Sequence, residues 1–169
     1  MILRRATIAD LALLRFWDGK PHVVAARGHG GGDDWEGELT RMLPWLELMI
    51  AEEAGRPVGV IRIIDPADEE THYWGDCAPN LRAIDIWIGG ESDLGHGLGS
   101  IMMRLALEHC FRDPRVQAVL IDPLASNTRA HRFYERLDFR RVERRLFGLD
   151  DCLVLRLDRG CWLPGDAGA

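Results

Sequence analysis

The sequence has no apolar run long enough to cross a membrane. No stretch approaches the roughly 18 apolar residues that a spanning helix needs. The opening residues, MILRRATIADLALL, also lack the apolar core of a signal peptide. From these two absences we expect a cytoplasmic protein that is neither exported nor inserted into a membrane.

Cysteine pairs at metal-binding or redox spacing are absent as well. The four cysteines include no C-x-x-C pair, and the histidines do not supply the spacing of a zinc site. We therefore expect reduced thiols and no bound metal. Repeats with a period of roughly 20–50 residues are missing too, which excludes solenoid folds.

Basic residues are in the minority. There are 21 Lys and Arg against 27 Asp and Glu, which leaves a net charge of −6. Binding to nucleic acid relies on dense basic side chains, so we expect no nucleic-acid partner. The acidic balance permits a cationic small-molecule partner instead. At 169 residues, 47% hydrophobic and 28% charged, the chain has the size and composition of one globular domain.

Apolar spacing, glycines and prolines divide the first half of the chain into short elements. The segment from Thr7 to Asp10 has the form of a capping box, which predicts the start of a helix. In order, we expect a strand at 2–6, a helix ending near residue 16, a loop at 28–34, a helix at 35–46, strands at 48–53 and 57–64 joined as a hairpin, and an acidic loop at 65–82.

The second half is more regular, and its run AVLID is almost wholly apolar. Such a run predicts burial on both faces, as in a parallel strand pair joined by a crossover helix. We expect a strand at 83–88, a helix at 97–111, a strand at 118–122, a helix at 127–137 and strands at 141–147 and 152–157. The chain thus predicts one α/β domain over 1–159, with a mixed central sheet flanked by helices and a flexible tail over 160–169.

The strongest local signal is a glycine-rich segment between a strand and an amphipathic helix. Glycines there let backbone N–H groups converge, and the helix N-terminus adds partial positive charge, so the segment suits a phosphate or pyrophosphate. A plain flexible turn is the alternative. The candidate cofactor-binding residues are Gly95, His96, Gly97, Leu98, Gly99 and Ser100.

Two other nucleotide-binding motifs fit this segment poorly. A P-loop needs a Lys after its last glycine, and none follows here. In a dinucleotide-binding fold, Ser100 would stand at the third glycine position and Asp122 would lie 27 residues beyond Gly95. Only one βαβ unit is evident besides, so dinucleotide binding stays a weak alternative.

Four motifs in order, IDIWIG, LGHGLGSIMMRLAL, VLIDP and SNTRAHRFYERLDF, resemble the GNAT superfamily of acyl-CoA-dependent N-acyltransferases. Within it, residues 83–147 look like the aminoglycoside 6'-N-acetyltransferases. The superfamily usually has Arg or Gln where Leu94 stands, although that subgroup tolerates an apolar residue. The resemblance implies a GNAT-like fold and acetyl-CoA as co-substrate.

The resemblance implies that two strand carboxylates, Asp85 and Asp122, lie near the acceptor amine. An alkylammonium is almost fully protonated at pH 7, so a carboxylate that accepts its proton lowers the barrier. Both carboxylates stand in apolar strand contexts, where an uncompensated charge is expensive. Asp85 is the expected base and Asp122 the expected substrate-binding group. Alternatively, Asp85 is a solvent-facing strand residue and Asp122 a turn former before Pro123.

Tyr134 is the expected acid, because a phenol can return a proton to a departing thiolate. Packing in a helix core is its alternative role. Asn127 stands seven residues earlier, which places both on one helix face, and its amide would bond the pantetheine arm. Backbone N–H groups of the strand Ile86, Trp87 and Ile88 would polarise the thioester carbonyl.

Trp74 and Trp87 are the aromatic candidates for packing against the acceptor substrate. Acidic residues gather in two loops of the first half, at 33–34 and 65–76, where a cationic amine would arrive. The helix and strand after residue 127 are rich in arginine, near where the CoA phosphates would lie. Apolar strands near the C-terminus could pair across a homodimer.

Three functions follow, and the sequence favours the first. It is an acetyl-CoA-dependent N-acetyltransferase that acts on a primary amine, with the 6'-amine of an aminoglycoside as the best-matched acceptor. The second is an acyltransferase for hydroxylysine in siderophore assembly. The third is a non-catalytic acyl-CoA-binding module, and the presence of Asp85 and Tyr134 argues against it.

Overall fold

The computed structural model describes residues 1–29 and 32–163, which contain a seven-stranded sheet in the order β1-β2-β3-β4-β5-β7-β6. Strands β4 and β5 are parallel and every other neighbouring pair is antiparallel. The elements are β1 (Ile2–Arg5), α1 (Leu11–Asp18), α2 (Pro21–Arg27), α3 (Trp35–Thr40), β2 (Leu46–Glu53), β3 (Arg56–Ile64), β4 (Leu81–Ile88), α4 (Leu98–Arg112), β5 (Ala118–Ile121), α5 (Thr128–Glu135), β6 (Arg140–Phe147) and β7 (Asp150–Asp158).

Local sequence signals explain where several elements begin and turn. The backbone N–H of Thr7 donates a 2.8 Å hydrogen bond to Oδ2 of Asp10, which confirms the predicted capping interaction before α1. Asn127 caps α5 by accepting a 3.0 Å bond from the N–H of Ala130. Ala54 and Gly55 both have positive φ, 51° and 78°, as a tight turn between β2 and β3 requires.

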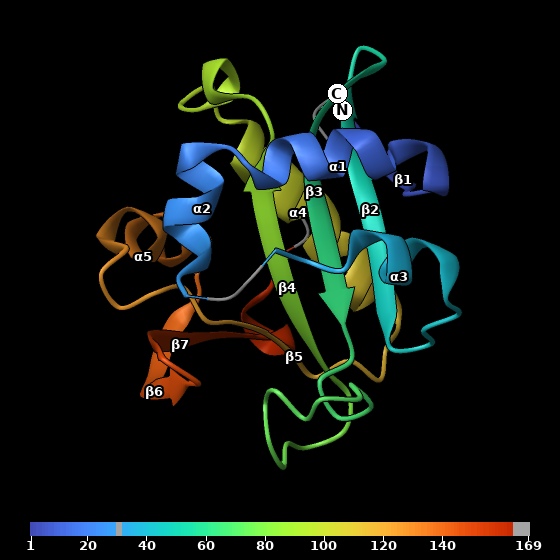
Figure 1. Cartoon of the computed structure of the whole chain (residues 1–169). Helices are drawn as coiled ribbons and strands as arrows, with labels where there is room; N and C mark the ends of the chain where they lie inside the picture. The colour runs from blue at the N-terminus through green and yellow to red at the C-terminus, as the bar shows by residue number, and fades with distance from the viewer. Residues whose placement is uncertain (30–31, 164–169) are drawn as a thin grey trace.

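Helices cover both faces of the sheet (Figure 1). Helix α4 lies behind β3 and β4 in that view, while α1, α2 and α3 lie in front. Side chains alternate along β4, so Ile84 and Ile86 pack into the core cluster that contains α4, and Trp87 packs with α1 and α3 residues on the other face. Helix α5 joins the α4 side through Tyr134, and Leu137, just after the helix, packs in the same cluster. The predicted α/β fold with a mixed sheet is confirmed.

The helix expected at 35–46 is shorter in the structure, and one helix was not expected. Helix α3 ends at Thr40. Pro44 disfavours helical backbone at the preceding residue, and Leu46 instead enters β2. Helix α2 begins with Pro21 at its first turn, a position where proline is tolerated because its missing N–H would be unpaired.

The chain just past Gly160 packs against the body of the domain. Trp162 stacks on Phe111 of α4 with ring centroids 5.9 Å apart, and it packs against the main core. The chain therefore stays docked past Gly160, although 160–169 was expected to be loose. Residues 164–169 lie outside the described residues.

Three of the predicted absences can be compared with the structure. No helix among the described residues is long and apolar enough to span a bilayer. All four cysteines, Cys77, Cys110, Cys152 and Cys161, lie in the described ranges and are free thiols. Within 1–29 and 32–163, no cluster of three or more His, Cys, Asp or Glu side chains could hold a metal ion.

Candidate active site

Strands β4 and β5 diverge after three paired residues, and the gap between them is the centre of the site. Their parallel pairing covers only Leu81 to Ala83 on β4. Beyond Ile121 the chain turns toward β7, where the N–H of Leu153 donates a 2.9 Å bond to the carbonyl of Pro123. The rest of β4, through Ile88, therefore has β3 on one side and no strand on the other.

The direction of the backbone groups along β4 decides which of them face this gap. The N–H of Gly89 bonds to the carbonyl of Val58, and the antiparallel register pairs Trp87 with Val60. Backbone N–H groups alternate in direction along a strand. The N–H of Trp87 therefore points toward β3, while the N–H groups of Ile86 and Ile88 point into the gap. The N–H of Trp87 thus bonds within the sheet. Of the three backbone N–H groups expected to contact the thioester, those of Ile86 and Ile88 remain as candidates.

Asp85 and Asp122 lie on the two sides of the gap. Extending the β4–β5 register, in which Ala83 pairs with Leu120, by two residues sets Asp122 opposite Asp85. Burial raises the pKa of Asp85 above its ordinary value. Burial and the nearby charge of Asp85 raise the pKa of Asp122 to about 7. Two carboxylates that resist ionisation together form a site that a cation would stabilise.

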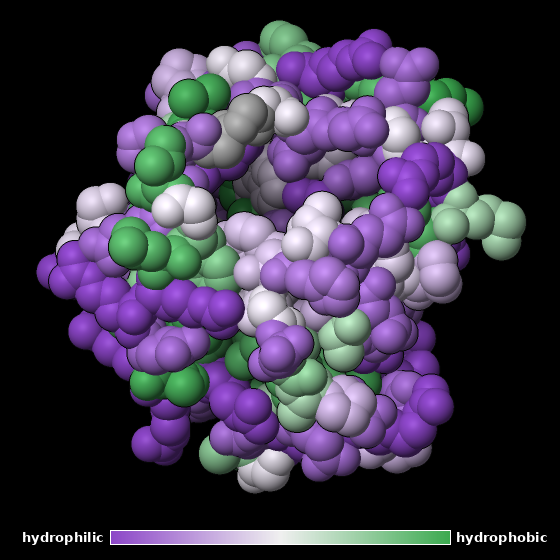
Figure 2. Space-filling view, turned by 60° about the horizontal axis from the view of Figure 1, so that its bottom comes forward, coloured by the Kyte–Doolittle hydropathy of each residue, from purple (hydrophilic) through white to green (hydrophobic). Residues whose placement is uncertain are grey.

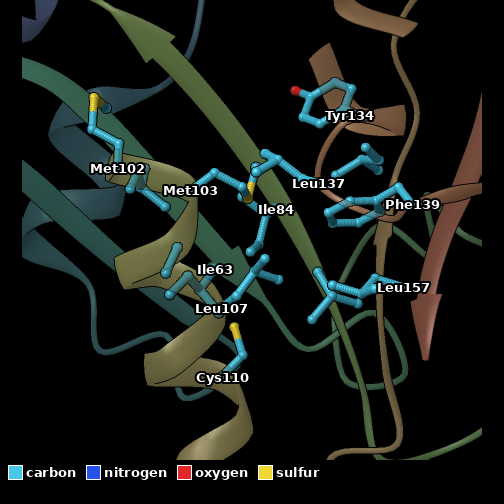
Figure 3. Close-up of a cluster of buried hydrophobic side chains, with 14 of the residues drawn as sticks. Ile63, Ile84, Met102, Met103, Leu107, Cys110, Tyr134, Leu137, Phe139 and Leu157 are labelled. Carbon is cyan, nitrogen blue, oxygen red and sulfur yellow. The ribbon is translucent and has the colours of Figure 1, made fainter. Parts of the chain in front are cut away.

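Tyr134 lies on the other face of the sheet, with its ring in the core. The ring packs edge-on against Phe133 and Phe139, at centroid distances of 4.9 Å and 5.8 Å. Figure 3 shows its hydroxyl pointing away from Phe139 and in the direction of the β4 ribbon. Burial, together with the charges of Asp85 and Asp122, raises the pKa of this phenol, so it stays protonated at neutral pH. The ring of Tyr134 is thus packed in the core while its hydroxyl points toward β4.

The glycine-rich segment forms an open turn at the N-terminus of α4. Gly95 and Gly97 have φ of +83° and +79°, and a Cβ at either would meet no atom within 4 Å. The first helical hydrogen bond there runs from Ser100 N–H to the Gly97 carbonyl, so the N–H groups of Leu98 and Gly99 precede the helical ladder. Such a cradle fits a pyrophosphate group. His96 is exposed at its rim.

One side-chain atom of Asn127 caps a helix, and the other can bond to a ligand. Its Oδ1 caps α5, which leaves the Nδ2 group as its donor. Asn127 and Tyr134 lie at the two ends of α5, and the ring of Phe133 reaches within 3.7 Å of the Cβ position of Gly99. The α5 face thus borders the α4 N-terminus, and together they could hold an extended phosphate-bearing cofactor such as coenzyme A.

Trp74 and Trp87, the two expected aromatic contacts, differ in their exposure. Trp74 is only 5% exposed and packs edge-on against Phe147 in a core cluster. Trp87 is half-buried and lies 5.8 Å from Trp35, on the same face of β4 as Asp85. Tyr73, 46% exposed, is the accessible aromatic of the 65–80 loop, and its hydroxyl donates a 2.6 Å bond to Asp122. Trp74 is therefore buried in the core, and its neighbour Tyr73 is the exposed aromatic that contacts Asp122.

An arginine on β3, which the sequence analysis did not single out, lies beside Asp85. The β3–β4 register pairs Arg62 with Asp85, and Nη1 of Arg62 lies 3.4 Å from Oδ2 of Asp85. Arg62 also contacts Asp33 at 3.0 Å and forms a close ion pair with Glu38 of α3. The signal was present in the sequence, because an Arg inside the apolar run VGVIRII needs a buried partner.

The surface over this region is open. Figure 2 shows a hollow on the side of the molecule that carries α1, α2 and α3, with hydrophilic residues along most of its rim. Asp85 and Trp87 face this side of the sheet, whereas Tyr134 approaches from the α4 side.

Comparison with known proteins agrees with this geometry. The family model for the acetyltransferase (GNAT) domain matches residues 7–147. The aminoglycoside N(6')-acetyltransferase type 1 of Klebsiella pneumoniae is 31% identical over 155 residues, which cover 82% of this chain and 73% of that protein. A kanamycin resistance protein of Rhizobium radiobacter is 39% identical over 74 residues, 43% of this chain and 68% of that protein.

Solved structures show the same architecture. The aminoglycoside acetyltransferase AAC(6')-Ib in complex with coenzyme A and kanamycin superposes with a TM-score of 0.84 at 29% identity, over 94% of this chain and 95% of that one. AAC(6')-Ib with ribostamycin and coenzyme A gives a TM-score of 0.87 at 28% identity, over 99% and 98% of the two chains. This chain belongs to the GNAT family of acetyltransferases.

Proposed function

We propose that the protein transfers an acetyl group from acetyl-CoA to a primary amine, with the 6'-amine of an aminoglycoside as the acceptor. The observation that carries the proposal is the placement of Asp85 and Asp122 on opposite sides of the β4–β5 gap, with the hydroxyl of Tyr134 directed toward it. The relatives described above, whose names refer to aminoglycosides and coenzyme A, support the same acceptor and donor.

Acetyl-CoA would supply an activated acyl carbon. The turn from Gly95 to Ser100 would bind its pyrophosphate, and Nδ2 of Asn127 would bond to the pantetheine arm. Residues Ile86 and Ile88 would donate backbone hydrogen bonds to the thioester carbonyl, where negative charge develops. These groups lie on β4, at the start of α4 and at the N-cap of α5.

Asp85 accepts a proton from the bound ammonium group, which frees the nitrogen lone pair to bond to the acyl carbon. The second proton that the nitrogen loses replaces the one that Tyr134 gives to the sulfur. A raised pKa suits this role, because a base works best when its pKa lies near the working pH. Tyr134 donates its proton to the sulfur as the carbon–sulfur bond breaks, and its raised pKa keeps that proton available. Asp122 holds the incoming ammonium group by charge.

The acceptor class follows from the charge and shape of the open side. Asp33, Glu38, Asp85 and Asp122 supply carboxylates there, and Trp87 supplies an aromatic surface. An amino sugar matches this combination, because the carboxylates attract its ammonium group while an indole packs against its ring.

A thiol-release assay with acetyl-CoA tests the proposal. The panel contains kanamycin, ribostamycin, a linear polyamine and hydroxylysine. We expect rapid turnover of the two aminoglycosides. Fast turnover of hydroxylysine without turnover of either aminoglycoside would assign the siderophore-type alternative. Binding of acetyl-CoA with no turnover of any amine would assign the non-catalytic module.

A further inference from the structure

We propose that Arg62 limits the site to acceptors with one positive charge beside Asp85. Its guanidinium takes the position that a second ammonium group would otherwise fill. The inference deepens the proposed function and rests on it. Arg62 then acts on acceptor specificity by occupying part of the acidic surface, and it takes no part in bond making or breaking.

Arg62 lies at the centre of three carboxylates from three separate segments. Its Nη1 is 3.0 Å from Oδ1 of Asp33, in the loop before α3, and 3.4 Å from Oδ2 of Asp85, on β4. Its Nη2 pairs closely with Oε1 of Glu38, on α3. The side chains of Arg62, Asp33 and Glu38 are only 16%, 16% and 10% exposed. The cluster is thus a built arrangement and not a set of surface ion pairs.

The charges in this cluster do not balance. One guanidinium faces three carboxylates, and Arg27, whose Nε lies 3.8 Å from Oδ2 of Asp33, is also paired with Asp18. With every group ionised, the four carboxylates and two guanidinium groups leave two negative charges in excess. Burial of such an excess is unfavourable unless a proton or a ligand cation compensates for it.

Glu38 is the group that responds to this imbalance. Burial, reinforced by the charges of Asp33, Asp85 and Asp34, raises its pKa to about 7, while Arg62 opposes the shift. Arg5 and Arg41 line a small cavity on its other side. A cation that enters next to Asp85 would therefore let Glu38 release its proton. The site as built compensates for one added positive charge with little further cost.

Several polar atoms around Arg62 are enclosed by protein and lack hydrogen-bond partners among the described residues. Within the described residues, Oδ2 of Asp33, Oε2 of Glu38 and the Nε1 atoms of Trp35 and Trp87 have no hydrogen-bond partner. Trp35 is only 2% exposed, and the guanidinium carbon of Arg62 lies 5.9 Å from its ring. Unpaired buried donors and acceptors are rare, which marks the surroundings of Arg62 as polar groups held in place without full compensation.

Removal of the Arg62 charge should therefore open the site to a second ammonium group. The test compares two matched acceptors, methyl 6-amino-6-deoxyglucoside and methyl 2,6-diamino-2,6-dideoxyglucoside, by kcat and KM. In Arg62→Gln we expect the ratio of kcat/KM for the diamine over the monoamine to rise by about tenfold to a hundredfold, mainly through KM. In Arg62→Lys, which keeps the charge, the ratio should stay near that of the parent protein.

Two more variants keep the test decisive. Glu38→Gln removes one negative charge and should lower the same ratio, which provides an independent test if Arg62→Gln does not fold. Arg115→Gln, in an exposed ion pair with Asp113 outside the site, should leave the ratio unchanged.

The outcomes separate this inference from the proposed function. Turnover of both acceptors with an unchanged ratio in Arg62→Gln, or an Arg62→Lys ratio equal to that of Arg62→Gln, overturns the role of the Arg62 charge. Failure of the parent protein to acetylate either acceptor contradicts the proposed function itself.

Discussion

The hydroxyl of Tyr73 donates a 2.6 Å hydrogen bond to Oδ2 of Asp122, which links the 65–80 loop to the end of β5. The ring of Tyr73 stacks on Phe147 of β6, with centroids 4.5 Å apart and planes 8° from parallel. Asp122 is thus held by a residue 49 positions earlier in the chain. This bond also opposes the burial that raises the pKa of Asp122.

Tyr73→Phe should weaken the binding of a cationic acceptor at neutral pH. The change removes the hydrogen bond that lowers the pKa of Asp122 and keeps the ring that stacks on Phe147. The carboxyl would then ionise only above pH 7. We expect KM for the amine to rise several-fold at pH 7 and to recover toward pH 9, measured as a KM–pH profile. A KM equal to that of the parent protein at every pH would contradict the link.

Asp85→Asn should lower kcat by about 10²–10⁴ at neutral pH, because the amine loses its proton acceptor. Binding of acetyl-CoA, measured by calorimetry, should stay unchanged. Activity should recover in part at high pH, where more of the amine is neutral without help. The exposed Asp76→Asn, in the 65–80 loop, is the control. Near-normal turnover in Asp85→Asn would remove Asp85 as the base.

Tyr134→Phe should separate the packing of this side chain from its chemistry. Phenylalanine keeps the edge-on contacts with Phe133 and Phe139, so the thermal unfolding midpoint should change little. Loss of the hydroxyl should lower kcat by about 10²-fold, with little effect on either KM. If kcat is unaffected in steady-state assays, then Tyr134 is a core residue only.

Gly97→Val should abolish binding of acetyl-CoA. The side chain would fill the open turn, and valine strains a backbone at φ +79°. Gly55→Val is a matched control, since Gly55 has φ +78° and equally open space in the β2–β3 turn, away from the site. Both variants should lose similar stability in urea unfolding, and only Gly97→Val should lose affinity in calorimetry. Equal affinity in the two variants would exclude the loop as the phosphate site.

Asp122→Asn should stabilise the protein at pH 8 and have little effect at pH 4. Burial raises the pKa of Asp122 to about 7, above the value near 3.9 expected in the unfolded chain. The folded state binds this proton more tightly, so the free energy of unfolding falls as pH rises from about 4 to 7 and then levels off. In Asp122→Asn the free energy of unfolding should not fall in this way, because the titrating carboxyl is absent.

Thermal unfolding at the two pH values measures this difference between the variant and the parent protein. A stabilisation of several degrees at pH 8 is expected, against almost none at pH 4. The exposed Asp68→Asn serves as control and should show no such contrast. A contrast of the opposite sign would mean that Asp122 is charged and well compensated in the folded protein.

Local sequence determined the parts of this protein that depend on near neighbours. The box from Thr7 to Asp10 and the glycine turn before α4 are set by a few consecutive residues, and each lies where the pattern indicates. The cap at Asn127 was not predicted, although it too depends only on near neighbours. The apolar run of β5 predicted its parallel pairing with β4, because a strand that is apolar on both faces must be buried on both.

Tertiary structure alone decided how the site is completed. Arg62 meets Asp85 through the β3–β4 register, and Glu38 and Asp33 reach it from α3 and the loop before it. Tyr73 and Trp74 both pack against Phe147, yet Trp74 is 5% exposed and Tyr73 is 46% exposed, a difference that adjacent positions in the sequence do not reveal. Spacing along a chain determines which face of an element a residue occupies, but which charges share a buried volume depends on how distant segments pack, and that packing sets the electrostatics of Asp85.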